Sequence, residues 1–194
     1  GLAMGATVSI GQSIGAGDKK RVSVFVGNTV ILFMGISLVL AVLLLFFVKP
    51  AVAVMSTPAE AVSGTAAYLT ICFLGIPFIT AYNVISSIFR GLGDSKSPMY
   101  FIAIACAVNI ILDYLFIGFF HLGASGAALG TTLSQACSVL FALIAIKRKQ
   151  TGLSLSGDCF RPQKKPLGKI LNIGIPVALQ DGFIQIAFII ITII

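Results

Sequence analysis

Long apolar stretches separated by short polar segments make up most of the chain. The stretches cover residues 1–17, 22–48, 61–89, 97–120, 123–146 and 170–194. A helix needs about 20 apolar residues to cross the hydrocarbon core of a membrane. Each stretch is predicted to be a helix, because backbone polar groups in lipid must be satisfied within the segment. The pattern therefore predicts an all-α, polytopic membrane protein with six transmembrane spans.

The first and last apolar stretches differ from the four between them. The first stretch is short, and the last is still apolar at Ile194. We interpret both as truncated spans, so the remainder of the same polypeptide is an expected partner. A basic, polar segment over 147–169 is the longest interruption. It is predicted to link a first bundle, residues 1–146, to a second bundle that begins with 170–194.

The composition excludes the main alternative classes of protein. Hydrophobic residues make up 58% of the chain and charged residues 10%, with a mean hydropathy of +1.07. A typical soluble domain has about 25% charged residues. So few charges could not cover a water-soluble globule without leaving large apolar patches. Disorder requires the opposite balance of low hydrophobicity and high net charge.

The net charge of +7 follows from where the basic residues lie. All of them except Lys49 fall in the segments 18–21, 90–97 and 147–169, which alternate with loops that have few cations. The positive-inside rule makes these three segments cytoplasmic. The charge therefore indicates orientation in the plasma membrane and gives no support for nucleic-acid binding. Attraction of 147–169 to the membrane surface is a second interpretation.

Two acids lie inside predicted spans, and one has a polar companion. A charged residue near the bilayer centre costs about 2.5–3.5 kcal/mol on insertion scales, and such residues usually face a cavity or a partner. Asn109 lies four residues before Asp113, which places both on one helix face. Their oxygens could bind a small cation, or Asp113 could accept a proton. The alternative is a buried hydrogen bond that joins two helices.

The following span carries a stripe of small residues and two polar neighbours. The stripe recurs every fourth residue, at Gly126, Gly130, Ser134 and Ser138. Such stripes allow helices to approach closely. Thr131 and Gln135 lie beside it. If this helix packs on the previous one, Thr131 could complete the site of Asn109 and Asp113.

Further polar residues and prolines are candidates for a substrate path and for hinges. The candidate path residues are Asp181, Gln180, Gln135 and Asn83. Asp181 could equally pair with a residue in the remainder of the polypeptide, and packing is the alternative for Asn83. Proline inside a span removes a backbone hydrogen bond and tends to kink the helix. Pro77 and Pro176 are therefore candidate hinges, although either could serve packing alone.

Neither enzyme chemistry nor a resident metal is indicated. The sequence contains no serine elbow, no intramembrane His-Glu cluster and no closely paired carboxylates. Its four cysteines have no CxxC spacing, which argues against a disulfide framework or a zinc site. We expect no enzymatic activity and no cofactor.

Several motifs in order resemble the multidrug and toxin extrusion (MATE) family. They are Gly11-Gln-Ser-Ile-Gly-Ala-Gly-Asp18, Arg90-Gly-Leu-Gly-Asp-Ser-Lys-Ser-Pro-Met99, Asn109-Ile-Ile-Leu-Asp113, Gly123-Ala-Ser-Gly-Ala-Ala-Leu-Gly-Thr131 and Gly174-Ile-Pro-Val-Ala-Leu-Gln180. The pattern is similar to the bacterial branches. The resemblance implies an antiporter of twelve helices in two lobes, of which this chain covers about helices two to seven.

The resemblance also implies a function and a site. MATE proteins export cationic and amphipathic small molecules in exchange for Na⁺ or H⁺. Asn109, Asp113 and Thr131 match the family's cation site in the amino-terminal lobe. A glutamate used by some members on helix seven has no match here, since Asp181 lies nearer the proline. Alternatives are a related exporter of lipid-linked oligosaccharides or polysaccharides, a membrane enzyme, or a scaffold that does not transport.

Overall fold

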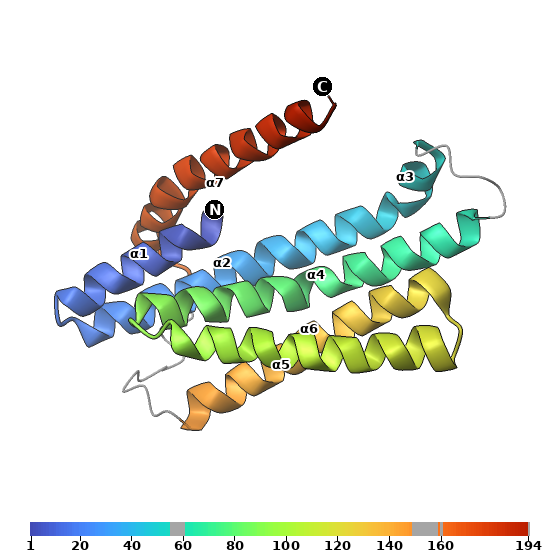
Figure 1. Ribbon diagram of the computed structural model, residues 1–194. Helices are drawn as coiled ribbons and strands as arrows, with labels where there is room; N and C mark the ends of the chain where they lie inside the picture. The colour runs from blue at the N-terminus through green and yellow to red at the C-terminus, as the bar shows by residue number, and fades with distance from the viewer. Residues whose placement is uncertain (55–60, 149–158, 160, 194) are drawn as a thin grey trace. The chain divides into compact units, whose positions relative to one another are not determined.

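The computed structural model describes residues 1–54, 61–148, 159 and 161–193, and they fold into helices (Figure 1). The elements in order are α1 (Leu2–Gly15), α2 (Lys19–Phe46), α3 (Val48–Val54), α4 (Val62–Gly91), α5 (Lys96–Asp113), the π-helix η1 (Tyr114–Phe119), α6 (Gly123–Arg148) and α7 (Lys164–Ile193). No strand occurs within the described residues. The predicted all-α fold is confirmed.

Five helical segments are long and apolar enough to cross a membrane. They are Lys19–Phe46, Val62–Gly91, Lys96–Phe119, Gly123–Ile146 and Lys164–Thr192. Each overlaps one predicted span. The first predicted span, expected to be short, forms α1 with 14 residues and is not among the five. The polytopic helical character predicted from the apolar stretches is confirmed for the described part of the chain.

Two predicted spans differ from the observed helices in detail. The stretch 97–120 is an α-helix as far as Asp113 and a π-helix from Tyr114 to Phe119. The last helix begins at Lys164 rather than near Ile170, so its first turns come from the predicted linker. Residues 149–158 and 160 of that linker lie outside the described residues.

The start of α7 is held by a contact with α2. The backbone N–H of Gln163 donates to Asn28 Oδ1 at 2.7 Å, and Asn28 is fully buried. Pro166 falls in the first helical turn, where the missing backbone donor costs little because these N–H groups have no helical acceptor. An anchored residue before the helix and a tolerated proline explain why the helix starts this early.

The sequence Gly-x-Gly-Asp occurs twice, at 15–18 and 91–94, and forms a similar turn each time. Gly17 and Gly93 have φ values of 73° and 82°, the left-handed region in which glycine has no steric penalty. In the first turn Asp18 then caps α2, because its Oδ1 accepts the Arg21 backbone N–H at 2.9 Å. Each glycine thus ends one helix and directs the chain into the next.

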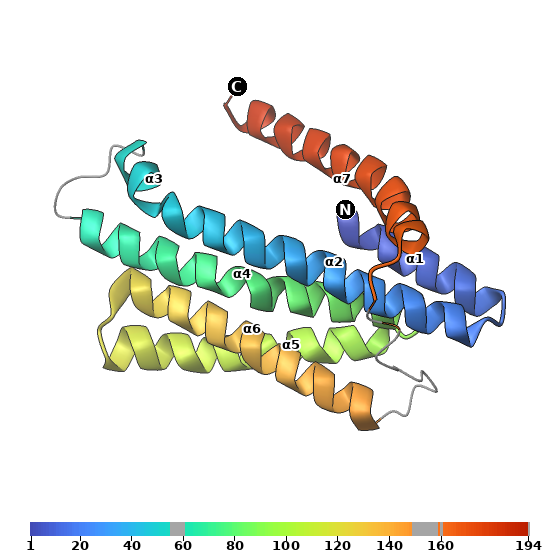
Figure 2. The ribbon, with the colours of Figure 1, turned by 180° about the vertical axis from the view of Figure 1, so that it is seen from behind.

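The described helices fall into two compact units, which are treated separately below. The first unit comprises residues 1–32, 83–95 and 150–194, and the second comprises 33–82 and 96–149. In the first unit α1 packs along α7 (Figure 2). In the second, α5 packs along α6, and both contact η1 (Figure 1). The helices α2 and α4 each contribute one part to each unit.

Candidate ion and substrate site

A small cavity in the second unit brings three of the predicted site residues together. Its volume is about 120 Å³. Its polar lining consists of Tyr82, Asn109, Thr131, Ser134 and Gln135. Asn109 comes from α5, and Thr131 and Gln135 come from α6. The predicted packing of these two helices therefore places two of the expected ion ligands and one expected path residue on one cavity.

Asp113 lies one turn beyond Asn109 on α5, and its carboxylate packs against α6. A β-carbon built on Gly130 would collide with Asp113 Oδ1. Gly130 immediately precedes Thr131, a lining residue of the cavity. Asp113 itself is not among the lining residues. The absence of a side chain at position 130 is thus what lets the carboxylate approach the backbone of α6 beside the cavity.

Three buried polar atoms at this site have no hydrogen-bond partner among the described residues. They are Asn109 Nδ2, Asp113 Oδ1 and Gln135 Oε1. Buried polar side-chain atoms are usually paired, so an unpaired group calls for an explanation such as a bound ion, water or ligand. Two of the three are acceptor oxygens, which suit a hard cation or a proton. The amide of Asn109 supplies a donor at the same place.

The backbone changes type at the acid itself. The α-helical hydrogen bonds of α5 end at Asp113, and η1 follows without a turn. The N–H of Phe120 bonds the carbonyl of Leu115 at 3.0 Å, a five-residue separation. Short π-helical segments occur frequently at functional sites. The apolar residues of this segment fit an ordinary α-helical span, so its π-helical backbone is not evident from the sequence.

Sequence reasoning also missed two polar groups of the cavity. Tyr82 donates its hydroxyl to the carbonyl of Pro98 at 3.4 Å, which fixes its ring beside α5. Ser134 donates to the carbonyl of Thr131 at 2.8 Å. In the sequence Ser134 belongs to the small-residue stripe. Its spacing of three residues from Thr131 was the one sign that it lies near the same site. Tyr82 stood next to the candidate Asn83 in the sequence.

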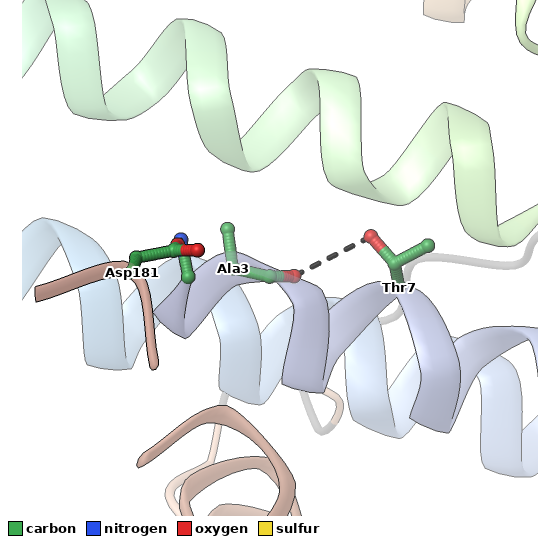
Figure 3. A network of polar contacts seen from close by, with 4 residues as sticks. Ala3, Thr7 and Asp181 are labelled. Carbon is green, nitrogen blue, oxygen red and sulfur yellow. Dashed lines mark hydrogen bonds and ion pairs between the residues drawn. The ribbon is translucent and has the colours of Figure 1, made fainter. Parts of the chain in front are cut away.

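The remaining predicted path residues lie in the first unit. Asp181, on α7, lies beside the start of α1, with its Oδ2 2.6 Å from the nitrogen of Gly1 (Figure 3). In the same view Thr7 donates its hydroxyl to the carbonyl of Ala3 at 3.4 Å. That hydroxyl also lies 3.2 Å from the carbonyl of Ser87. These contacts connect α1 with α7 and with the end of α4.

Gln180 and Asn83 do not line the cavity between α5 and α6. Gln180 lies in a separate hollow along α7, of about 590 Å³, together with the candidate hinge Pro176. Asn83 is exposed on α4. Pro77 and Pro176 both lie inside helices, as predicted. Their role as hinges stays a prediction.

Comparison with known proteins gives a consistent result. The family model MatE matches residues 1–115, more than half of the chain. The chain belongs to the MATE family. It is 36% identical over 177 residues to the probable multidrug resistance protein YpnP of Bacillus subtilis, covering 90% of this chain and 39% of YpnP. It is 32% identical over 180 residues to the multidrug export protein MepA of Staphylococcus aureus, covering 92% of this chain and 40% of MepA.

Solved structures of MATE transporters share the fold. An outward-facing conformation of a multidrug resistance MATE family transporter superposes with a TM-score of 0.88 at 28% identity, covering 97% of this chain and 42% of that one. An inward-facing conformation gives 0.82 at 28% identity, covering 90% and 41%. This MATE chain therefore spans about two-fifths of the length of the relatives it matches.

Proposed function

We propose that this MATE chain is part of an ion-coupled antiporter that exports cationic or amphipathic small molecules across the bacterial plasma membrane. Its membership of the family and its similarity to proteins named for multidrug resistance and export support this function. The segments 18–21, 90–97 and 147–169 would then face the cytoplasm, as their basic residues favour.

The observation that carries the proposal is the unpaired Asp113 Oδ1 beside the cavity of Asn109 and Thr131. This buried carboxylate oxygen has no hydrogen-bond partner among the described residues, and a bound cation or proton would satisfy it. Binding of Na⁺ or H⁺ at Asp113, helped by Asn109 and Thr131, would therefore stabilise whichever conformation best encloses the site. Gln135 lines the same cavity and would contact the substrate or the ion.

Alternating access is the proposed mechanism of transport. The chain is similar to both an outward-facing and an inward-facing MATE structure. This similarity supports the proposal that this part of the protein keeps its fold in both states. In this proposal residues 1–146 belong to the amino-terminal lobe, 147–169 form the connector, and 170–194 begin the second lobe. Asp181, Gln180 and Asn83 would line the substrate path, and Pro77 and Pro176 would allow the helices to bend.

The decisive experiment measures efflux of a cationic dye from proteoliposomes that contain the full-length protein. Separate Na⁺ and pH gradients identify the coupling ion. We expect Asp113→Asn to reduce gradient-driven efflux to the level of empty liposomes, because a neutral amide cannot balance the ion. The variant should still insert into the membrane. Efflux at the unmodified rate would refute the assignment of Asp113.

A matched pair of threonine variants tests the ligand set. Thr131 lines the cavity, whereas the neighbouring Thr132 faces α4 and lies 3.5 Å from the carbonyl of Ile71. Replacement by valine preserves the shape and removes the hydroxyl. We expect Thr131→Val to raise the ion concentration required for half-maximal efflux, and Thr132→Val to leave it unchanged. Equal effects of the two changes would contradict a specific role for Thr131.

A further inference from the structure

A third pocket lies in the first unit, where α2 and α7 begin. Its volume is about 420 Å³. Four basic residues line it: Lys20 and Arg21 from α2, and Lys165 and Lys169 from α7. Asp18 is the one acid among the described residues that line it. We call this feature the basic pocket.

A buried aromatic ring brings two of these cations together. Phe25 is 2% exposed and lines the pocket. The guanidinium carbon of Arg21 lies 5.9 Å from the centre of its ring, and the ammonium nitrogen of Lys169 lies 5.8 Å from it. Both distances are within the range of a cation–π interaction. Two like charges are thus held over one ring, although they repel each other.

The helix termini add to the positive potential. The first turns of α2 and α7 contain no acidic residue, while Lys20, Arg21 and Lys165 lie within them. The positive end of a helix dipole favours anions and disfavours such cations. Asp18, whose carboxylate caps α2 by accepting the backbone N–H of Arg21, supplies one negative charge against the four basic residues. Among the described residues that line the pocket, four basic side chains therefore face one carboxylate, and an anionic ligand would balance part of the excess positive charge.

The pocket is built from anchored segments and has an apolar side. The bond from Gln163 to the fully buried Asn28 fixes the chain where α7 starts. Val24 and Pro166 line the pocket beside Phe25. Both α2 and α7 are apolar enough to cross a membrane, and in that arrangement their basic first turns would lie at its surface. An occupant of this pocket would meet phosphate-binding cations and apolar groups at the level of the lipid headgroups.

We propose that the basic pocket binds the phosphate group of an anionic phospholipid. Arg and Lys are the residues that recognise phosphate, and juxtamembrane basic clusters attract anionic lipids. A free phosphate ion offers the same chemistry, but it would fill a small part of the volume and leave the apolar side uncovered. This inference is independent of the transport activity proposed above.

Lipid binding can be measured on the purified full-length protein in detergent. The probes are phosphatidylglycerol, phosphatidylcholine and inorganic phosphate, each titrated while the melting temperature is recorded. We expect phosphatidylglycerol to raise the melting temperature in a saturable manner, and the other two to have little effect at the same concentration. An equal effect of inorganic phosphate would assign the pocket to a soluble anion, and an equal effect of phosphatidylcholine would refute an anion site.

Two double variants with the same change of net charge separate the pocket from general basicity. Arg21→Gln with Lys169→Gln removes the pair over Phe25. Lys19→Gln with Lys164→Gln removes neighbouring charges that do not line the pocket. We expect the first variant to bind phosphatidylglycerol about tenfold more weakly or worse, and the second to bind nearly as the unmodified protein does. Equal weakening would refute the site.

A third double variant tests the pocket even if the first variant fails to fold. Lys20→Gln with Lys165→Gln changes two exposed side chains of the pocket and leaves the cation–π pair in place. It should also weaken phosphatidylglycerol binding relative to the Lys19 and Lys164 control. Unchanged binding in this variant would overturn the proposal.

Discussion

Gly130 makes the position of Asp113 possible. The carboxylate oxygen occupies the space that any side chain at position 130 would need. The Asp113 backbone nitrogen lies 3.5 Å from that position, an ordinary van der Waals contact, so the collision involves the carboxylate and not the main chain. The small-residue stripe of α6 therefore has a second role at Gly130. Besides allowing close helix packing, it leaves room for the carboxylate of Asp113, which we propose binds the ion.

Gly130→Ala is therefore expected to displace the carboxylate and reduce ion-driven dye efflux to near the level of empty liposomes. Gly35→Ala is the matched control, since a β-carbon there meets nothing within 4 Å. Alanine is a better helix former than glycine, so the control should be as stable as the unmodified protein or more stable. If both variants transport normally, Gly130 does not position Asp113.

At the residue scale the sequence predicted part of the candidate site. The four-residue spacing of Asn109 and Asp113 and the position of Thr131 depend on helical periodicity, which is visible in sequence. The contact of Gly130 with Asp113 depends on the register between two helices, which periodicity does not determine. Tyr82 is not predictable for the same reason, because its place beside the cavity depends on a contact with Pro98 of α5.

At the scale of elements, α1 and α7 meet through glycine. A β-carbon on Gly5 would collide with the carbonyl of Ile170, and one on Gly174 would lie 2.6 Å from the carbonyl of Leu2. Helices in membranes associate largely by close packing of small residues. The two backbones are in contact here, so a larger residue must separate the helices.

We expect Gly174→Val to destabilise the protein by about 1–3 kcal/mol, the usual cost of overpacking. Gly182→Val, on the same helix, should have a much smaller effect, because a β-carbon at Gly182 meets nothing within 4 Å. Thermal unfolding in detergent would reveal the difference. Similar melting temperatures for the two variants would show that the glycine contact contributes little to stability.

The elements themselves were largely predictable, and their ends less so. The length of each apolar stretch was enough to predict a span. Unpaired polar groups are costly in lipid, and this cost applies to every residue of a span. The early start of α7 was not predictable in this way. It depends on the bond between Gln163 and Asn28, two residues that are far apart in the sequence.

At the scale of the whole molecule, the orientation in the membrane can be tested. The native cysteines, Cys72, Cys106, Cys137 and Cys159, would first be replaced. Single cysteines at Ser95 and His121 then report the ends of the span that contains α5. We expect a membrane-impermeant thiol reagent to label His121→Cys in intact cells, and Ser95→Cys only after permeabilisation. The opposite pattern would reverse the proposed orientation.

The division of the whole chain into lobes is less accessible to sequence than its orientation. Orientation depends on the count of basic residues in each loop, and that count is explicit in the sequence. A lobe boundary depends on which helices pack together. The basic segment 147–169 indicated a boundary by composition alone, and much of it lies outside the described residues.

The wider turns of η1 have a consequence for comparing this chain with its relatives. Hydrogen bonds in a π-helix span five residues instead of four, so a given length of helix contains more residues there. A relative with a regular α-helix after the acid would reach the same loop with a shorter sequence. An alignment of the two should therefore open a gap between Tyr114 and Phe119. Forcing such sequences into an ungapped alignment would pair the wrong residues on one side of Asp113.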